Sequence, residues 1–436
     1  MKNKRDFSVP NQADYLNNNA IKTALPPYRV LDLTEGGCML GGRLLGDLGA
    51  DVIKIEPPGG SGSRIAPYYR NVASPEKSLF WFAYNFNKRG ITLNLSDEEG
   101  RELFKGLIRT TDIIIESFKP GYMNSLELGY SDICKIKPDI IYTSITAFGQ
   151  HGPKVHYKGS DLTSWASGGY LYACGNPDRA PVWISFPQAG FFGGAEGAIG
   201  SMTAMLHRGD TGEGQHVDVS MQECSISPEM QILQMWDVAG VEFHRSGGHL
   251  VIPSTGVKQP IYFKTKDGYV MILLQGGNDP FITSSRKLVE WMTEEGMAPE
   301  WLQSLDWAID YNASTMGQKI ADRAGKAVAE FTLTKTKSEL YIEGSMGRGI
   351  LIAPENNTKD ISEDLQLEAR VYWREIEHPE LNKTLTYCGP FVRMSETPIG
   401  YKMRAPLIGE HNREIYAGEL GLSQERFNTL KNKGII

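Results

Sequence analysis

The chain contains 436 residues, of which 41% are hydrophobic and 22% are charged, and its formal net charge is −7 at pH 7. This length exceeds what one compact core usually holds, so we expect two domains of an ordinary soluble protein. The acidic balance, without any basic tract, excludes nucleic acid as a bulk partner, and no apolar run reaches the ~18 residues of a membrane helix.

The first half of the chain alternates short apolar runs with amphipathic stretches. Residues 1–27 precede this pattern, lack the apolar core of a signal peptide and are expected to form a loose extension. Residues 28–33 and 51–55 predict strands that flank a helix at 39–48, which makes a βαβ unit. The pattern continues with strands expected at 90–95, 112–116 and 140–145, and helices at 96–109 and 131–135.

Local signals refine this first domain. Ser96 is the expected N-cap of the helix at 96–109, because Glu99 completes a capping box three residues later. The first ~150 residues therefore predict a doubly wound α/β domain. The turn after the first strand reads Glu35-Gly36-Gly37-Cys38 and is not the GxGxxG fingerprint, which disfavours a nicotinamide-dependent dehydrogenase.

The second half changes character. Residues 189–207 are rich in Gly, Ala, Met and Phe and predict a buried helix, and residues 216–220 alternate as a strand does. From about residue 230 loop signals become frequent, and residues 260–265 and 268–274 predict a β-hairpin. Helical segments with tryptophans follow to about residue 350, so we expect a second, smaller α+β domain.

Asp178 is the main candidate for chemistry. It lies in the loop sequence Gly175–Pro181, directly after Pro177. The prolines and the glycine disfavour a helix or sheet here. A carboxylate on a rigid loop can act as a nucleophile or base, although spacing alone favours a surface turn aspartate.

The cysteines and histidines show no metal pattern. The five cysteines lie far apart without a CxxC pair, and the eight histidines form no HxxxH or HExxH motif. We therefore expect reduced thiols, a cytoplasmic setting and no metal.

Several stretches, in consistent order and spacing, resemble the family III CoA-transferases, which include formyl-CoA and carnitine CoA-transferases and are close to α-methylacyl-CoA racemases. The matching stretches are Val30–Leu33, Leu48–Glu56, Asn87–Leu93, Glu116–Gly121, Phe148–Pro153, Arg208–Gln215 and Arg404–Asn412. The resemblance implies a Rossmann-like large domain at 28–228 and 351–436 and a small domain at 229–350. It also implies an obligate dimer of interlocked rings, formed by two copies or with a homologous subunit.

The resemblance further implies transfer of coenzyme A from an acyl-CoA donor, with succinyl-CoA as a candidate, to a small carboxylic acid, without a permanently bound cofactor. Asp178 matches the place of the family nucleophile, which forms a mixed anhydride and then an aspartyl-CoA thioester. Seven positions correspond to the family's CoA-binding places: Leu93, Ser96, Ser117, Phe118, Lys119, Ser125 and Thr146.

Some residues depart from the family pattern. Basic residues are missing at Ser96, Ser125 and Thr146, and the usual glutamine after the first strand is missing near Glu35, which disfavours formate and oxalate as substrates. Each lost cation removes a phosphate contact of about 1.5–3 kcal/mol. Five other cations could replace these phosphate contacts: Lys54, Arg64, Lys88, Arg89 and Lys119. The alternative interpretation is that they are ordinary solvated surface charges. Aromatic residues near Asp178 hint at a bulkier acid: Trp165, Tyr170, Tyr172, Trp183 and Phe186.

Two alternatives stay open. A racemase would use Asp161 as one catalyst, but Ser160 and the region of Ser131 lack the racemase histidines, and the sequence favours a structural cap or turn as the role of Asp161. The chain can also be a non-catalytic subunit of a hetero-oligomeric transferase, because it lacks several expected site residues.

Overall fold

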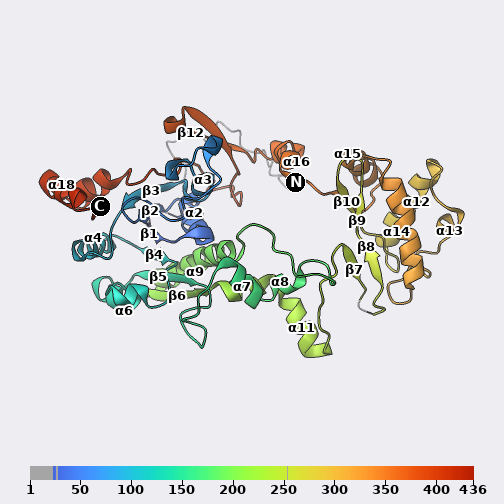
Figure 1. The fold of residues 1–436 in the computed structure, drawn as a ribbon, viewed down its shortest axis with the longest axis horizontal. Helices are drawn as coiled ribbons and strands as arrows, with labels where there is room; N and C mark the ends of the chain where they lie inside the picture. The colour runs from blue at the N-terminus through green and yellow to red at the C-terminus, as the bar shows by residue number, and fades with distance from the viewer. Residues whose placement is uncertain (1–22, 26–27, 253) are drawn as a thin grey trace, which may run out of the picture. The chain divides into compact units, whose positions relative to one another are not determined.

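The computed structural model describes residues 23–25, 28–252 and 254–436. The extension expected at 1–27 therefore lies almost wholly outside the described residues. The chain divides into two compact units (Figure 1). Unit 1 consists of Met1–Leu171, Trp183–Asp237 and Gln366–Ile436, and unit 2 of Tyr172–Val182 and Val238–Leu365. The domain boundaries expected near residues 228 and 350 stay predictions.

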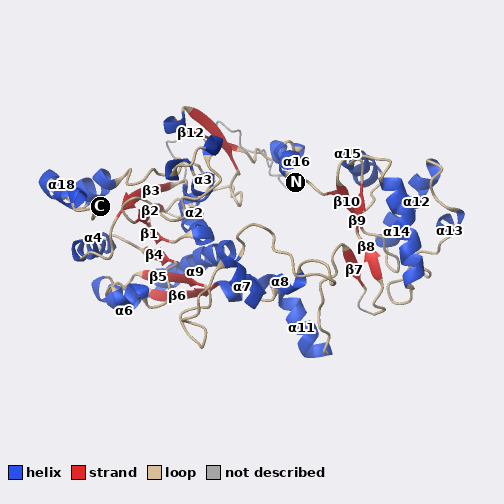
Figure 2. Ribbon diagram, viewed as in Figure 1, coloured by secondary structure: helices blue, strands red, loops and turns tan. Residues whose placement is uncertain are grey.

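Unit 1 is built on a six-stranded parallel sheet with the order β3-β2-β1-β4-β5-β6 (Figure 2). Its strands are β1 (Arg29–Leu33), β2 (Asp51–Glu56), β3 (Lys88–Thr92), β4 (Ile113–Glu116), β5 (Ile141–Thr146) and β6 (Gln215–Ser220). The strand order reverses between β1 and β4, as in doubly wound folds, where ligands bind beyond the carboxyl ends of the strands. The α/β class and the parallel sheet expected from the sequence are thus confirmed.

The helices between these strands are α2 (Met39–Asp47), α3 (Leu79–Asn85), α4 (Glu98–Ile108), α5 (Tyr122–Ser125), α6 (Tyr130–Ile136), α7 (Asp161–Ser167) and α9 (Ala189–Thr211). Two further helices of unit 1, α10 (Met221–Ile226) and α18 (Gln424–Asn432), follow the last of these strands. An antiparallel pair, β12 (Arg374–His378) and β13 (Lys383–Tyr387), also belongs to unit 1. A boundary between the units falls within α8 (Tyr170–Ala173), α11 (Met230–Ala239) and α17 (Leu365–Ala369).

The side chains of each strand point alternately to the two faces of the sheet, and a hydrophobic core lies on each face. Leu31 and Ile53 belong to the core that contains Phe104 of α4, whereas Val30 and Val52 belong to the core that contains Ala198 of α9. Successive side chains of a strand point to opposite faces, so one apolar run serves both cores.

One capping prediction is wrong. The helix α4 starts at Glu98, and its N-cap is Asp97, whose side chain accepts a hydrogen bond from the Glu99 amide. The Ser96 amide instead donates to the Asn94 side chain at 3.1 Å, so Ser96 belongs to the preceding turn. Ser and Asp are both good caps, and the sequence alone did not separate two adjacent candidates.

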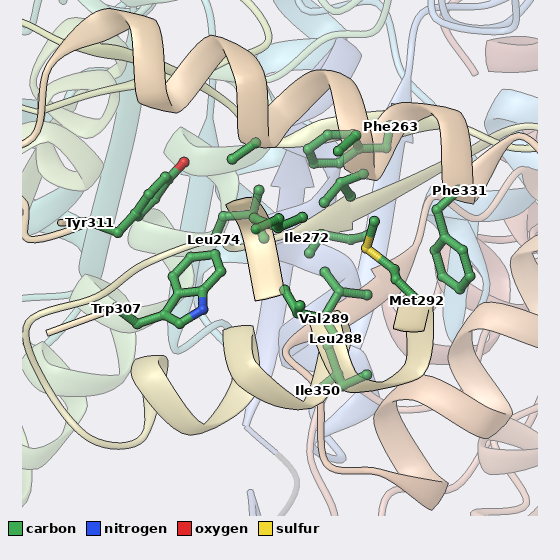
Figure 3. Packing of buried hydrophobic residues seen from close by; sticks show 14 of the residues in the cluster. Phe263, Ile272, Leu274, Leu288, Val289, Met292, Trp307, Tyr311, Phe331 and Ile350 are labelled. Carbon is green, nitrogen blue, oxygen red and sulfur yellow. The ribbon is translucent and has the colours of Figure 1, made fainter. Parts of the chain in front are cut away.

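Unit 2 contains a three-stranded antiparallel sheet with the order β11-β10-β9 and a separate pair of strands. Its elements are β7 (His249–Val251), β8 (Lys258–Pro260), β9 (Tyr262–Lys264), β10 (Tyr269–Ile272), α12 (Phe281–Glu294), α13 (Glu300–Gln303), α14 (Gln318–Thr332), α15 (Lys337–Glu339), β11 (Ile352–Pro354) and α16 (Thr358–Ser362). The expected hairpin exists as β9 and β10, with shorter strands than predicted. Figure 3 shows the hydrophobic core of unit 2, where Ile272, Met292 and Phe331 pack together.

Candidate functional site

The loop that carries Asp178 is a tight turn in unit 2. The Arg179 amide donates to the Asn176 carbonyl at 3.3 Å, and the Val182 amide donates to the Cys174 carbonyl at 3.1 Å, which closes the base of the loop. Asp178 is exposed. Within residues 23–25, 28–252 and 254–436 its carboxylate makes no hydrogen bond or ion pair. The structure therefore places this carboxylate where an incoming molecule can reach it.

Arg245 holds this loop from the side, and the sequence reasoning missed it. Its guanidinium donates to three loop carbonyls, those of Asn176 at 2.9 Å, Arg179 at 2.6 Å and Tyr172 at 3.4 Å. The Gly247 amide adds a bond to the Gly175 carbonyl at 2.9 Å. Only a long-range contact reveals this role, because the sequence around Arg245 indicates nothing more than a loop.

Asp161 has a different environment, in unit 1. It is the first residue of α7, and its carboxylate accepts hydrogen bonds from the Gln188 amide at 3.0 Å and the Gly190 amide at 2.9 Å. These amides belong to the start of α9, a helix of 23 residues. A helix N-terminus stabilises negative charge, so the Asp161 carboxylate serves as a cap for α9.

The seven CoA-binding candidates separate into two groups. Leu93 and Ser96 follow β3, whereas Ser117, Phe118, Lys119 and Ser125 follow β4, and Thr146 ends the adjacent strand β5. The strand β3 lies three strand positions from β4, or roughly 14 Å at the usual spacing. The structure thus groups the residues at the β4 and β5 ends and leaves Leu93 and Ser96 at the far edge of the sheet.

Within the larger group the side chains differ in access. Lys119 is exposed, whereas Thr146 is buried and its hydroxyl has no partner among the described residues. The Ser125 hydroxyl donates to the Tyr122 carbonyl at 2.6 Å, inside its own helix turn. The Ser117 hydroxyl accepts a hydrogen bond from the Glu35 amide at 2.8 Å, which connects the loop after β4 to the turn after β1.

Most of the cations considered as substitutes for the missing phosphate contacts already form ion pairs with carboxylates of this chain. Lys54 and Lys88 are fully buried and form ion pairs with Asp32 at 3.5 and 2.7 Å. Burial raises the pKa of Asp32, but the two lysines together lower it to about 2. Arg64 is buried as well and pairs with Glu56 at 2.7 Å.

Arg89 is a fourth cation with carboxylate partners, because it pairs with Asp51 at 2.6 Å. Lys119 differs from these four: it is exposed and makes no ion pair within the described part of the chain. The interpretation of Lys54, Arg64 and Lys88 as accessible charges, whether for phosphate or for solvent, is therefore wrong.

Within the described residues, no group of three or more His, Cys, Asp or Glu side chains is arranged to hold a metal ion. None of the helices in the described ranges combines the length and apolarity needed to cross a membrane.

Comparisons with known proteins agree on one family. The family model for CoA-transferase family III matches residues 25–412. The chain is 32% identical to the succinyl-CoA:(R)-benzylsuccinate CoA-transferase subunit BbsE of Thauera aromatica, over 94% of this chain and 97% of that protein. It is also 32% identical to the formyl-CoA:oxalate CoA-transferase of Streptomyces avermitilis, over 95% and 99% of the two chains. A solved structure of a CAIB/BAIF family protein from Brucella suis superposes with a TM-score of 0.77 at 28% identity, covering 91% of this chain and 99% of that one.

Proposed function

This chain belongs to CoA-transferase family III, and we propose that it takes part in moving coenzyme A from an acyl-CoA donor, with succinyl-CoA as the first candidate, to a carboxylic acid acceptor. The observation that carries this proposal is the family match over residues 25–412, together with relatives named as CoA-transferases that align over nearly their whole length. Coenzyme A is then a substrate and not a resident cofactor.

In the proposed reaction Asp178 is the nucleophile. Its carboxylate attacks the thioester carbonyl and expels the CoA thiolate, which leaves an aspartyl–acyl mixed anhydride. The thiolate attacks the aspartyl carbonyl, releases the donor acid and leaves an aspartyl-CoA thioester. The acceptor carboxylate then attacks this thioester, expels the CoA thiolate and leaves an aspartyl–acceptor mixed anhydride. The thiolate finally attacks the acceptor carbonyl of this anhydride, which forms the acceptor-CoA thioester and frees the Asp178 carboxylate. The carboxylate is exposed and makes no ion pair with the described residues, and its loop is held by Arg245, which supports this role.

The acceptor is proposed to be larger than formate or oxalate. This proposal follows the missing cations and the resemblance to a relative named for (R)-benzylsuccinate. The aromatic residues considered as recognition elements divide into two kinds. Trp165 is buried and packs on Tyr170 at 4.6 Å between ring centroids, which is ordinary packing, whereas Trp183 and Phe186 are exposed. Only exposed rings are available to contact an acid.

We further propose that the chain works in a dimer of interlocked rings. Large apolar side chains stand exposed on two helices of unit 1, on α9 and on the part of α11 before residue 238. They are Ile199, Leu206, Met230, Leu233 and Trp236. Exposed apolar side chains in such number indicate a protein partner. The partner is a second copy of this chain or a homologous subunit.

A second candidate function is that of a non-catalytic subunit in a hetero-oligomeric transferase. The N-terminus of α9 is the type of site where backbone amides can stabilise an oxyanion, and here the Asp161 carboxylate already occupies the amides of Gln188 and Gly190. The relative BbsE is itself named as a subunit. The racemase alternative is less well supported, because both amides bind Asp161 and no histidine accompanies it.

The deciding experiment mixes the purified chain with succinyl-CoA and hydroxylamine, followed by intact mass measurement and peptide mapping. A hydroxamate on Asp178 supports the catalytic proposal, and Asp178→Ala should lose it. No adduct with a panel of acyl-CoA thioesters, combined with activity only after co-expression with a homologous chain, supports the non-catalytic subunit. Full transfer activity of Asp178→Ala in a homodimer contradicts the assignment of the nucleophile.

A further inference from the structure

A polar cavity of about 260 Å³ lies in unit 1 at the carboxyl ends of β4 and β5. The segment that carries Asp178 belongs to unit 2. Its lining includes Glu116 at the end of β4, Ser144 of β5 and His216 of β6, three residues to which the proposed reaction gives no role. Lys119 of the loop after β4 lines the same cavity. A group of ionisable side chains therefore lies directly against the proposed CoA-binding loop.

Glu116 connects the sheet to this loop. One of its carboxylate oxygens accepts a hydrogen bond from the Phe118 amide at 2.7 Å, and Ser144, its register neighbour on β5, lowers the pKa of this carboxylate. The Ser144 hydroxyl is in turn 3.0 Å from His216 Nε2. The three side chains thus form a row across β4, β5 and β6, and the Glu116 end of this row binds the backbone of the loop at Phe118.

We propose that Glu116 is a positioning residue for the loop Ser117–Gly121, and that its ionised form, held through Ser144 and His216, sets the loop for coenzyme A. This inference rests on the proposed function, because it takes the loop as a CoA contact. Ionised Glu116 is an acceptor only, so Ser144 donates to it and accepts from His216. Protonated Glu116 can donate to Ser144, and the direction of hydrogen bonding along this row then reverses.

The geometry makes this change accessible near neutral pH. Burial raises the pKa of Glu116 to about 7, although hydrogen bonds from Ser144 and the Phe118 amide lower it, and the Asp218 carboxylate adds a smaller upward effect. Burial also lowers the pKa of His216, which favours the neutral imidazole. The other titratable or charged groups around Glu116 are Glu35, Cys38, Lys119, Tyr130, Tyr142, His151 and Asp218.

The ionised form should bind CoA more tightly for a local reason. A hydrogen bond to a carboxylate is stronger than one to a neutral acid, so the Phe118 amide is held more firmly when Glu116 is charged. The negative charge of Glu116 also repels CoA phosphates, but Lys119 on the same loop offsets part of that repulsion. We expect roughly tenfold tighter CoA binding for the ionised form, which is about the difference between a charged and a neutral hydrogen bond.

The test is calorimetric titration of the full chain with CoA at pH 6 and pH 8. The terminal phosphate of CoA also titrates near pH 6, so the informative quantity is the affinity of the wild type relative to Glu116→Gln at each pH. We expect a ratio near one at pH 6 and near ten at pH 8. Glu102→Gln, which changes an exposed glutamate that pairs with Lys105, is the matched control and should follow the wild type.

A second variant, Ser144→Ala, tests the proposal independently in case the Glu116→Gln protein does not fold. Ser144→Ala removes the hydroxyl that lowers the Glu116 pKa, so the midpoint of the affinity change should move to higher pH. Equal affinities of wild type and Glu116→Gln at both pH values, or an unmoved midpoint in Ser144→Ala, overturn the positioning role. Absence of CoA binding by the wild type at either pH overturns the proposed function as well.

Discussion

The region around Asp161 and the loop around Asp178 differ in where each carboxylate finds its hydrogen-bond donors. Asp161 takes both donors from the first turn of α9, at 2.9 and 3.0 Å, within one packed unit. The Asp178 loop is held through its backbone by Arg245, so that the guanidinium satisfies carbonyls and leaves the Asp178 carboxylate to solvent. A carboxylate that caps a helix contributes to stability, whereas one on a fixed backbone with unused oxygens is available for chemistry.

The strongest test of this contrast is Asp178→Ala. If Asp178 is the nucleophile, the variant should lose transfer activity by at least about 10⁴-fold, because removal of a covalent nucleophile leaves only binding and electrostatic contributions. The unfolding free energy should change little, since the side chain is exposed. Activity is followed by chromatography of acyl-CoA exchange between succinyl-CoA and an acceptor acid.

The matched control for this change is Asp210→Ala, an exposed aspartate at the end of α9. It should keep wild-type exchange. An Asp178→Ala protein that is as active as Asp210→Ala would make Asp178 a turn residue and contradict its assignment as the nucleophile.

Asp32 adds a fully buried carboxylate to the comparison of Asp161 and Asp178. Asp32→Asn leaves Lys54 and Lys88 buried without a counter-ion, and we expect a loss of about 3–5 kcal/mol in the free energy of unfolding. Urea denaturation followed by circular dichroism at pH 7 measures it. Asp51→Asn, which breaks partly exposed ion pairs with Arg29 and Arg89, should cost about 1 kcal/mol or less. Similar losses of unfolding free energy in Asp32→Asn and Asp51→Asn would mean that burial does not decide how much a lost ion pair destabilises the protein.

The Asp32 group also shows what the sequence could and could not predict. The strand β1, the helix α2 and the strand β2 follow from local periodicity and the glycine turn at Gly49, and the resemblance to the family is confirmed by the family match. The pairing of Asp32 with Lys54 depends on the register of two parallel strands, in which these residues are direct neighbours. Register between strands is a long-range property, so the burial of Lys54 was not visible in the sequence.

The same reason limits the site prediction. The sequence pointed to Asp178 and to the loop after β4, because turn chemistry and family motifs are local signals. It did not point to Arg245 or to Glu116, whose roles depend on carbonyls and hydroxyls from other segments. It named Leu93 and Ser96 beside Ser117 as CoA-binding candidates without showing that three strand positions separate β3 from β4, and these assignments stay predictions.

Folding shifts the pKa of Glu116 upward, whereas it shifts the pKa of Asp32 downward, and the upward shift predicts how stability depends on pH. The pKa of Glu116 is about 7 in the folded protein and near 4.5 when unfolded, so the folded state holds the proton more tightly. Stability from this group is full below pH 4.5 and declines as pH rises toward 7, by about 3 kcal/mol in total. Between pH 5 and pH 8 the wild type should therefore lose stability relative to Glu116→Gln. A pH-independent difference between the two proteins in urea denaturation would contradict this burial effect.

The smallest effect concerns Asp161. Asp161→Ala removes the cap from α9 and should lower the unfolding free energy by about 1–2 kcal/mol, because two amides at the start of the helix lose their acceptors. Asp161→Asn keeps one oxygen acceptor and should lose less. Thermal or urea denaturation measures both, alongside acyl-CoA exchange and deuterium uptake at the α-carbon of a 2-methylacyl-CoA. A capping role predicts reduced stability in Asp161→Ala without deuterium uptake in any variant. Deuterium uptake by the wild type that Asp161→Ala abolishes would instead make Asp161 an acid–base catalyst, and the contrast with Asp178 would no longer hold.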